Sequence, residues 1–298
     1  MLDQMGDRMK LYEGIEANRI LIPGLPICVR VDGRAFHTFT KGMERPYDIV
    51  MSNAMIETMK HLVDETDACI GYVQSDEISL VLSDIKEPLF GGRIAKLISV
   101  IASIATAKFN VEIHKSFPDK PMATFDCRVW NVPNRTEAAN TILWREFDAT
   151  KNSISMAARA YYSHKQLLGK NSSQMQDLLM KKGVNWNDYP AFFKRGSYAR
   201  RCVITRKFLP EEFDNLPEKH EARKNPDMEF MRSCIETLDM PIFSKVVNRE
   251  DVIFENAAPL VNDELFSAIA EANEIASGRS KVKSYKNAKE MIKDILNE

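Results

Sequence analysis

The order of strand and helix patterns between residues 27 and 132 constrains the fold of this chain more than any other feature. Four short runs rich in apolar and β-branched residues are separated by two longer runs with the spacing of amphipathic or buried helices. In chain order the patterns are a strand at 27–31, a helix capped by Asp48, strands at 68–74 and 78–82, a helix at about 93–110 and a strand at 123–132.

This β-α-β-β-α-β order is that of the split β-α-β unit of ferredoxin-like folds. In that arrangement the first and second strands run parallel and the third lies antiparallel between them, because right-handed crossovers place both helices on one face. The end of the first strand and the turn between the second and third strands then share one edge of the sheet. We therefore predict an α+β fold with a ferredoxin-like core, added helices and a C-terminal extension.

Two aspartates fall at this shared edge. Asp32 follows the first strand in Val-Asp-Gly-Arg, and Asp76 occupies the turn in Gln-Ser-Asp-Glu. Neighbouring strands lie about 5 Å apart, so both carboxylates could reach a pair of metal ions spaced ~3.5–4 Å. Gly33 permits close approach of a ligand, Arg34 could meet phosphate, and Glu77 adds charge that is costly without a cation. Aspartate also favours turns for backbone reasons alone, which is the alternative explanation.

Bulk properties exclude several classes of protein. The 298 residues, 44% of them hydrophobic, are enough for a full core, and 41 basic against 42 acidic residues mean that a polyanion must be bound by local patches. The five cysteines are widely spaced without Cys-x-x-Cys, which favours a reduced, cytoplasmic protein. We expect neither export nor membrane insertion, because no apolar run approaches the roughly 18 residues of a membrane span.

Other motifs are ambiguous or missing. No Rossmann or P-loop glycine pattern and no zinc-ligand spacing is present. His37 lies between two aromatics, where a structural role and a functional role are both open, and Lys96 lies on an otherwise apolar helix, where phosphate is one candidate partner. Basic residues interleaved with aromatics at 181–207 fit nucleic-acid or triphosphate binding, but also a solvated face.

Five segments match one known family in combination. They are Val-Asp-Gly-Arg-Ala-Phe-His-Thr-Phe at 31–39, Arg-Pro-Tyr-Asp at 45–48, Gln-Ser-Asp-Glu-Ile-Ser at 74–79, Arg93 with Lys96-Leu97 and Ser99, and Phe-Asp-Cys-Arg-Val at 125–129. Together they resemble the tRNA-histidine guanylyltransferase family, over about residues 5 to 207. The resemblance implies a catalytic core similar to the palm of polymerases that adds nucleotides to the 5′ end of tRNA, in the 3′-to-5′ direction.

The resemblance also implies roles for individual residues. Asp32, the backbone carbonyl of Gly33 and Asp76 would hold two Mg²⁺ ions, with GTP and ATP as substrates, tRNA as partner and a homotetramer as the assembly. The residues implied in nucleotide or phosphate binding are Gly33, Phe36, His37, Arg45, Ser75, Arg93, Lys96 and Arg128, to which the position of Arg34 beside Gly33 adds a further candidate.

Two departures from the family pattern bear on the substrate. After Trp-Arg-x-x-Asp at 144–148, only Asn152 remains of the His-Ile-Asn-Asn-Leu-Tyr-Asn found in eukaryotic members. This loss resembles the guanylyltransferase-like branch of bacteria and archaea, whose members repair 5′-truncated tRNAs. Phe-Lys-Arg-Gly at 193–196 replaces the usual Tyr-Arg-Lys-Gly, and Lys194 and Arg195, like Asn152, are candidate contacts to tRNA or phosphate.

Two other functions remain open at this level. A nucleotide or diguanylate cyclase also uses a palm with paired aspartates, although the basic and aromatic segment favours a polymeric substrate. A non-catalytic RNA-binding module would place aromatics on its central strands, whereas the first strand here carries Ile27, Val29 and Val31. In either case we divide the chain into a catalytic region at 1–207, including tRNA-contacting helices, and an extension at 208–298.

Overall fold

The computed structural model describes residues 4–225 and 227–262, and their strands form one antiparallel sheet in the order β4-β1-β3-β2-β5-β6. The sequence pattern also predicts a final helix from about Asp263 to near Ala276, and this segment lies outside the described residues. The strands are β1 (Ile27–Gly33), β2 (Ile70–Gln74), β3 (Glu77–Leu82), β4 (Phe125–Asn131), β5 (Ser197–Lys207) and β6 (Glu229–Leu238).

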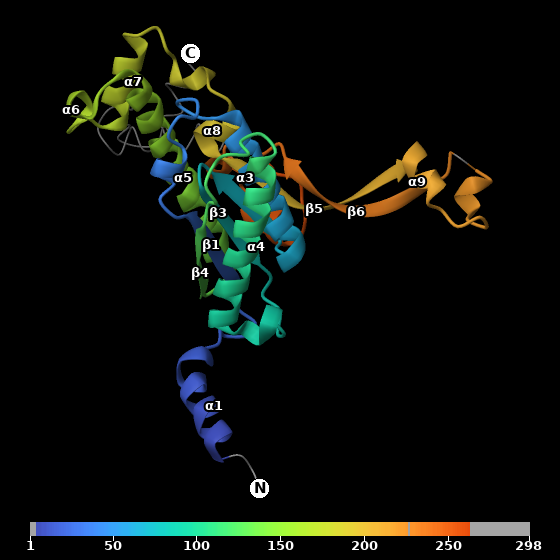
Figure 1. Cartoon of the computed structure of the whole chain (residues 1–298). Coiled ribbons are helices and arrows are strands. Elements are labelled where there is room, and N and C mark those ends of the chain that lie inside the picture. The colour runs from blue at the N-terminus through green and yellow to red at the C-terminus, as the bar shows by residue number, and fades with distance from the viewer. Residues whose placement is uncertain (1–3, 226, 263–298) are drawn as a thin grey trace, which may run out of the picture.

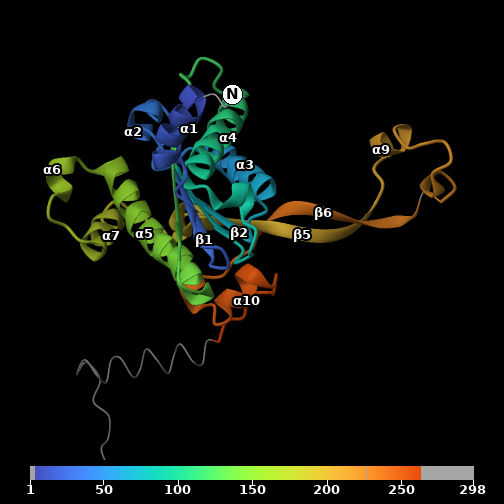
Figure 2. The same ribbon diagram turned by 90° about the horizontal axis from the view of Figure 1, so that it is seen from below.

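Helices cover both faces of this sheet (Figures 1 and 2). The α-helices are α1 (Gln4–Ala17), α2 (Phe36–Phe39), α3 (Ile49–Thr66), α4 (Ile94–His114), α5 (Arg135–Tyr161), α6 (His164–Leu167), α7 (Ser172–Met180), α8 (Ala191–Arg195), α9 (Pro210–Asp214) and α10 (Arg249–Phe254). Short 3₁₀ turns are η1 (Leu89–Gly92), η2 (Trp186–Asp188), η3 (Glu221–Arg223) and η4 (Phe243–Lys245).

The predicted β-α-β-β-α-β unit is confirmed as β1-α3-β2-β3-α4-β4. Strand β3 lies between β1 and β2 and is antiparallel to both, so β1 and β2 run parallel. The Asp48 cap is also as predicted, because its carboxylate accepts hydrogen bonds from the backbone N–H groups of Val50 (2.9 Å) and Met51 (3.1 Å). These bonds satisfy N–H groups that have no partner within the helix.

The sequence pattern from Thr136 to about Leu168 predicts one long helical stretch, but the structure has two helices there. Helix α5 ends at Tyr161 because Tyr162 is extended (φ −131°, ψ 145°). The next helix, α6, then begins with a capping box between Ser163 and Gln166. The consequence is that the last turns of α5 and the helices after it form a separate small cluster around Ala157, Leu179 and Phe193.

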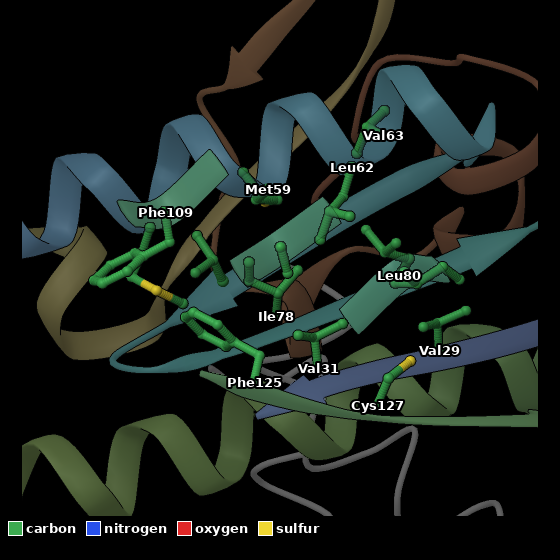
Figure 3. Packing of buried hydrophobic residues seen from close by; sticks show 14 of the residues in the cluster. Val29, Val31, Met59, Leu62, Val63, Ile78, Leu80, Phe109, Phe125 and Cys127 are labelled. Atoms are coloured by element: carbon green, nitrogen blue, oxygen red, sulfur yellow. The ribbon is translucent and has the colours of Figure 1, made fainter. Parts of the chain in front are cut away.

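The two faces of the sheet have different cores. Alternate residues of the strands, among them Val31, Ile78 and Leu80, pack against α3 and α4, where Met59 and Phe109 are also buried (Figure 3). The other face packs against α5 through a second set of buried residues, Cys28, Tyr72, Val81, Ala138, Ile142 and Tyr198. The strand period of two therefore decides which β1 side chains reach each layer.

Helix α4 is long and apolar enough to cross a membrane by composition, with a mean hydropathy of 1.5. One such helix is weak evidence, because the core helix of a soluble protein passes the same test. Here Leu97, Ile101, Ala105 and Phe109 form a buried stripe that packs against the sheet. This stripe accounts for part of the apolar composition of α4, since 28% of its most apolar window is buried.

The last two strands leave the body of the protein. β5 pairs with β2 only from Ser197 to Ala199, and its remaining residues pair with β6 alone. We call residues 200–207 with their partners 229–236 the ribbon, which projects from the sheet in Figures 1 and 2. Phe208 and Phe230 stack at its outer end, with ring centroids 4.1 Å apart.

After β6 the chain returns to the face covered by α5. Phe243, Val246 and Val252 are fully buried there, and Arg135 of α5 forms salt bridges with Asp84 and Glu255. The division expected after residue 207 falls at the outer end of the ribbon. Residues on both sides of that point contribute to one sheet and to the core on the α5 face.

Candidate active site

The structure brings Asp32 and Asp76 to the same edge of the sheet, as the topology predicted. Asp32 is paired in register with Glu77 of β3 on one side and with Asp126 of β4 on the other. The backbone N–H of Gly33 donates to the carbonyl of Asp76 over 3.0 Å. A hydrogen bond thus joins the end of β1 directly to the turn between β2 and β3.

The turn itself orients the Asp76 carboxylate. Ser75 adopts a left-handed conformation (φ 55°), which a tight two-residue connection requires. Its hydroxyl donates to Oδ1 of Asp76 over 3.0 Å. The predicted residue Ser75 therefore positions the acidic side chain next to it.

The surroundings of the two carboxylates disfavour their charged forms. Burial raises the pKa of Asp32, and the nearby charge of Asp126 raises it further. Burial also raises the pKa of Asp76, with a smaller contribution from Asp32. Within residues 4–225 and 227–262, neither side chain forms a salt bridge. Two partly desolvated carboxylates at one edge are suitable oxygen ligands for a hard cation.

The number of ligands also fits magnesium. No group of three or more His, Cys, Asp or Glu side chains that could hold a metal occurs in the described part of the chain. Mg²⁺ dehydrates reluctantly and is commonly held by one or two carboxylates together with waters and substrate phosphates. A site with two aspartates and a backbone carbonyl matches that requirement.

Glu77, the neighbouring acid, has a different partner. Nη2 of Arg145 on α5 donates to Oε2 of Glu77 over 2.8 Å, and Asp148 accepts from Nη1 of the same guanidinium, also over 2.8 Å. Nε of Arg145 lies 2.5 Å from Oε1 of Glu77 but is too poorly aligned for a further hydrogen bond. Both members of the pair are shielded from solvent, with side chains 12% and 18% exposed. Glu77 is thereby neutralised within the protein.

A cavity of about 590 Å³ opens beside Asp76, in the size range of small-molecule sites. Of the predicted residues, those lining it are Gly33, Phe36, His37, Arg45, Ser75 and Asp76. Thr40, Tyr47, Met156 and Arg159 also contribute to its wall. Two of the lining residues, Arg45 and Arg159, are exposed cations that can approach an anionic ligand.

Phe36 forms part of the core as well as of the cavity wall. Its ring is 3% exposed and lies 5.1–5.5 Å from the rings of Phe39, Phe109 and Phe125. A Cβ atom at Gly33 would lie 2.3 Å from this ring. The packing of Phe36 therefore requires glycine at 33, whether or not a ligand approaches. His37, in contrast, is exposed.

Arg34 and Arg128 lie near the aspartates but do not line the cavity. The backbone N–H of Arg34 donates to the carbonyl of Thr124 over 2.9 Å, and its side chain is exposed. Arg128 lies on β4, directly opposite Arg30, with its guanidinium 3.7 Å from Asp126. These two arginines add positive charge on the β4 side of the acidic edge.

Arg93 and Lys96 lie at the other end of the sheet. The backbone beside them is bonded to Leu21 and Arg19, near the beginning of β1. The part of α4 that reaches the Asp32 edge begins at Thr106, which accepts from the N–H of Phe125. Ten residues of helix separate Lys96 from Thr106, about 15 Å along the axis. Arg93 and Lys96 therefore do not line the cavity of their own chain.

The three candidate RNA contacts are distributed over α5 and α8. Asn152 is exposed on α5. The ammonium of Lys194 donates to the carbonyl of Asn187 and lies 5.6 Å from the ring centroid of Trp186. Burial and the neighbouring Arg195 lower the pKa of Lys194. The Arg195 carbonyl accepts from the hydroxyl of Tyr72 over 2.8 Å.

Sequence reasoning assigned no role to Arg145, Asp126 or Arg159. Arg145 and Asp126 lie within the quoted motifs, and those motifs were the available signal. No sequence signal pointed to Arg159, because its place in the cavity wall depends on where the C-terminal turns of α5 lie relative to the sheet edge.

Comparisons with known proteins agree on one family. The family model described as tRNAHis guanylyltransferase matches residues 6–133. The tRNA(His) guanylyltransferase of Saccharomyces cerevisiae is 30% identical over 212 residues, which cover 64% of this chain and 87% of the yeast protein.

Solved structures give the same result. A bacterial tRNA(His) guanylyltransferase-like protein in complex with ATP has a TM-score of 0.69 and 38% identity, covering 84% of this chain and 99% of that one. The structure described as such a protein in complex with GTP has a TM-score of 0.62 and 34% identity, covering 85% and 98%. The predicted palm-like α+β core is confirmed by this likeness.

Proposed function

Because this chain belongs to the tRNA(His) guanylyltransferase family, we propose that it adds nucleotides to the 5′ end of tRNA in the 3′-to-5′ direction. The family consists of nucleotide-binding nucleotidyltransferases, and relatives of this chain have been solved with ATP and with GTP. We further propose that the substrates of this chain are GTP and ATP and that its reaction uses two Mg²⁺ ions.

One observation carries the proposal more than any other. Asp32 and Asp76 meet at a sheet edge, neither of them in a salt bridge among the described residues, beside a cavity large enough for a nucleotide. A structural turn would not need two desolvated acids at this place. A nucleotidyltransferase does, because oxygen ligands must hold cations against a triphosphate.

Each side chain has a distinct part in this proposal. Asp32, the Gly33 carbonyl and Asp76 would hold the ions, which would supply charge neutralisation and lower the pKa of an attacking hydroxyl. The Ser75 hydroxyl fixes the Asp76 carboxylate. Arg145 pairs with Glu77, which would keep this third carboxylate from approaching the ions.

The nucleotide itself is held by the cavity wall. Arg45 and Arg159 line the cavity and are exposed, and they would bind phosphate oxygens. His37 and Tyr47 offer ring surfaces near the same space. Arg34 and Arg128 are proposed to contact the 5′ phosphate of the RNA from the β4 side, because both are exposed beside the acidic edge.

The cyclase and RNA-module alternatives have less support. The relatives are transferases acting on tRNA by name. In addition, Ile27, Val29 and Val31 are buried against the core and present no stacking surface to RNA. The loss of most of the eukaryotic motif after Asp148 favours repair of 5′-shortened tRNAs over strict guanylation of histidine tRNA.

The decisive experiment supplies labelled nucleotides to intact and 5′-shortened tRNAs, with either a complementary or a non-complementary base opposite the site of addition. We expect addition to shortened tRNAs, directed by the opposing base, and dependent on a divalent cation. Matched Asp76→Asn protein serves as the control and should bind tRNA without transferring nucleotide. Exclusive guanylation of intact histidine tRNA, independent of the opposing base, would contradict the repair proposal.

A further inference from the structure

Two cysteines stand directly opposite each other at the base of the ribbon. In the register of β5 and β6, Cys202 is the partner of Cys234. Both thiols are free and half-buried. The pair lies outside the candidate active site, on strands that sequence reasoning did not connect.

The spacing of such a pair is close to that of a disulfide. Residues directly opposite in an antiparallel pair have Cβ atoms roughly 4.5–5.5 Å apart, and a disulfide needs roughly 3.5–4.5 Å. A bond between Cys202 and Cys234 therefore requires only a small approach of the two strands. Because the strands must move together, the disulfide would be slightly strained. Strained disulfides are reduced more easily, as a reversible disulfide must be.

The position of the pair gives the bond a structural consequence. Arg200 is anchored to the body by hydrogen bonds to the carbonyls of Val252 and Ala257, both 2.9 Å. Arg201 is anchored by salt bridges to Asp64 and Asp67. Cys202 is the first β5 residue beyond these anchors. A bond to Cys234 would clamp the ribbon where it leaves the protein body.

The remaining three cysteines do not compete for this pairing. Burial raises the pKa of Cys28 and of Cys69 to about 11 and that of Cys127 to about 12, so these thiols stay protonated and unreactive. In the sheet, Cys28 is opposite Val81 and Trp130, and Cys127 is opposite Val31. Cys202 and Cys234 are the cysteines that face each other across two strands.

We propose that Cys202 and Cys234 form a reversible disulfide that clamps the base of the ribbon. The oxidant is a small-molecule disulfide such as oxidised glutathione. One thiolate attacks a glutathione sulfur to give a mixed disulfide and releases one reduced glutathione. The second thiolate then displaces the other glutathione, so that two thiols and one disulfide become one protein disulfide and two reduced glutathiones.

The surroundings of Cys234 disfavour its thiolate. Burial raises the pKa of its thiol, and the adjacent Glu236 carboxylate raises it further. The sulfur of Cys202 donates only a long contact, 3.8 Å, to the carbonyl of Arg200. The proposal is independent of the nucleotidyltransferase activity, because neither thiol touches the cavity.

The test uses the folded full-length protein in a graded series of reduced and oxidised glutathione. After alkylation in denaturant and trypsin digestion, we expect the peptides 202–206 and 233–245 to be joined, with a mass two hydrogens below their sum. The other three of the five cysteines should be alkylated. Treatment with a thiol reductant should separate the peptides again.

Variants and a structural readout complete the test. Cys202→Ser or Cys234→Ser should retain a glutathione adduct on the remaining thiol, whereas the control Cys69→Ser should cross-link as the wild type does. Nicking by trypsin within 208–228 should leave oxidised wild-type fragments joined on a non-reducing gel and Cys234→Ser fragments separate. Five alkylated thiols under all folded conditions, or a stable glutathione adduct on the wild-type pair, would overturn the proposal.

Discussion

Arg145 on α5 holds Glu77, the residue after Asp76, by a hydrogen-bonded ion pair across 68 residues of sequence. Replacing Arg145 with alanine leaves the largely shielded Glu77 carboxylate without its main partner. We expect a loss of roughly 3 kcal/mol in unfolding free energy, as for broken buried pairs, together with slower nucleotide transfer because Glu77 is then free to approach the ions. Urea denaturation and single-turnover transfer measure the two effects.

The control for this variant is Arg201→Ala, which breaks an exposed pair with Asp64 and should cost under about 1 kcal/mol. The double variant Arg145→Ala with Glu77→Gln should recover transfer beyond the single variant. If it does not, Arg145 acts in some way other than through Glu77.

Each of the variants Asp32→Asn and Asp76→Asn should be less active than the wild type but, without divalent ions, more stable. Transfer should fall more than the roughly 10–100-fold seen for outer-shell metal partners. Without divalent ions the variants should be more stable than the wild type, because each removes a charge whose pKa is raised by burial. Thermal melts with EDTA and with Mn²⁺ separate these cases. A wild-type melt unchanged by Mn²⁺ would count against the metal site.

Gly33→Ala tests the packing of Phe36 against the end of β1. The added methyl would meet the Phe36 ring at 2.3 Å, and a ring held among three other phenylalanines cannot move away without cost. We expect destabilisation of about 1–3 kcal/mol, the usual range for overpacking. Denaturant unfolding measures it, and combining the change with Phe36→Leu should restore part of the loss. An unaltered midpoint in the single variant would show that the ring relocates freely.

The charge of the cavity can be tested with Arg45→Ala and Arg159→Ala. Each should raise the Kd for GTP by roughly ten-fold or more, because a charge-assisted hydrogen bond to phosphate is worth about 1.5–3 kcal/mol. Lys60→Ala, which removes a cation paired with Glu57 on α3, is the matched control and should leave the Kd unchanged. If Arg45→Ala, Arg159→Ala and Lys60→Ala all bind GTP with the same Kd, the triphosphate does not bind at this cavity wall.

Glu146 makes stability depend on pH. Its carboxylate is 2% exposed, accepts from the hydroxyl of Tyr198 (2.8 Å) and the N–H of Phe243 (2.9 Å), and has a pKa raised by burial above the ordinary 4.5. At a pH between the ordinary pKa of 4.5 and the raised pKa of Glu146 in the folded protein, folding therefore takes up a proton. The contribution to unfolding free energy is fully present below pH 4.5 and is lost as the pH rises through the folded pKa.

Glu146→Gln should remove this dependence, because the amide keeps both bonds by donating to the Tyr198 oxygen. Urea unfolding in EDTA between about pH 5 and 7 should give a flatter curve than the wild type. Glu137→Gln, an exposed change on the same helix, should follow the wild type. Parallel curves for wild type and Glu146→Gln would mean that Glu146 does not take up this proton.

Local signals were enough to predict the acidic edge. Asp32 lies beside Asp76 because of three features: the Asp48 cap, the hairpin turn at Ser75 and the strand order. Each of these depends on residues close together in sequence and could therefore be predicted. Strand β6 was not predicted, because its stability comes from pairing with β5 across a long excursion and not from a regular apolar pattern. The Arg145 partner of Glu77 was missed for the same reason.

Direction along the sheet explains the placement of the basic residues on α4. Strand β3 runs away from the Asp76 turn, so the helix that follows it must begin at the far end. Arg93 and Lys96 precede the part of α4 that returns to the acidic edge. The family motif that contains Arg93 and Lys96 does not show which end of the sheet they occupy, whereas the direction of β3 does.

The way β2 is shared between the hairpin and β5 connects the ribbon mechanically to the acidic turn. Val73 is bonded in register to Ser197, and only Gln74 separates it from Ser75. A load applied at the outer end of the ribbon is therefore transmitted along continuous backbone hydrogen bonds to the residues that orient Asp76. Bending of the ribbon would therefore act on β2 three residues before Asp76.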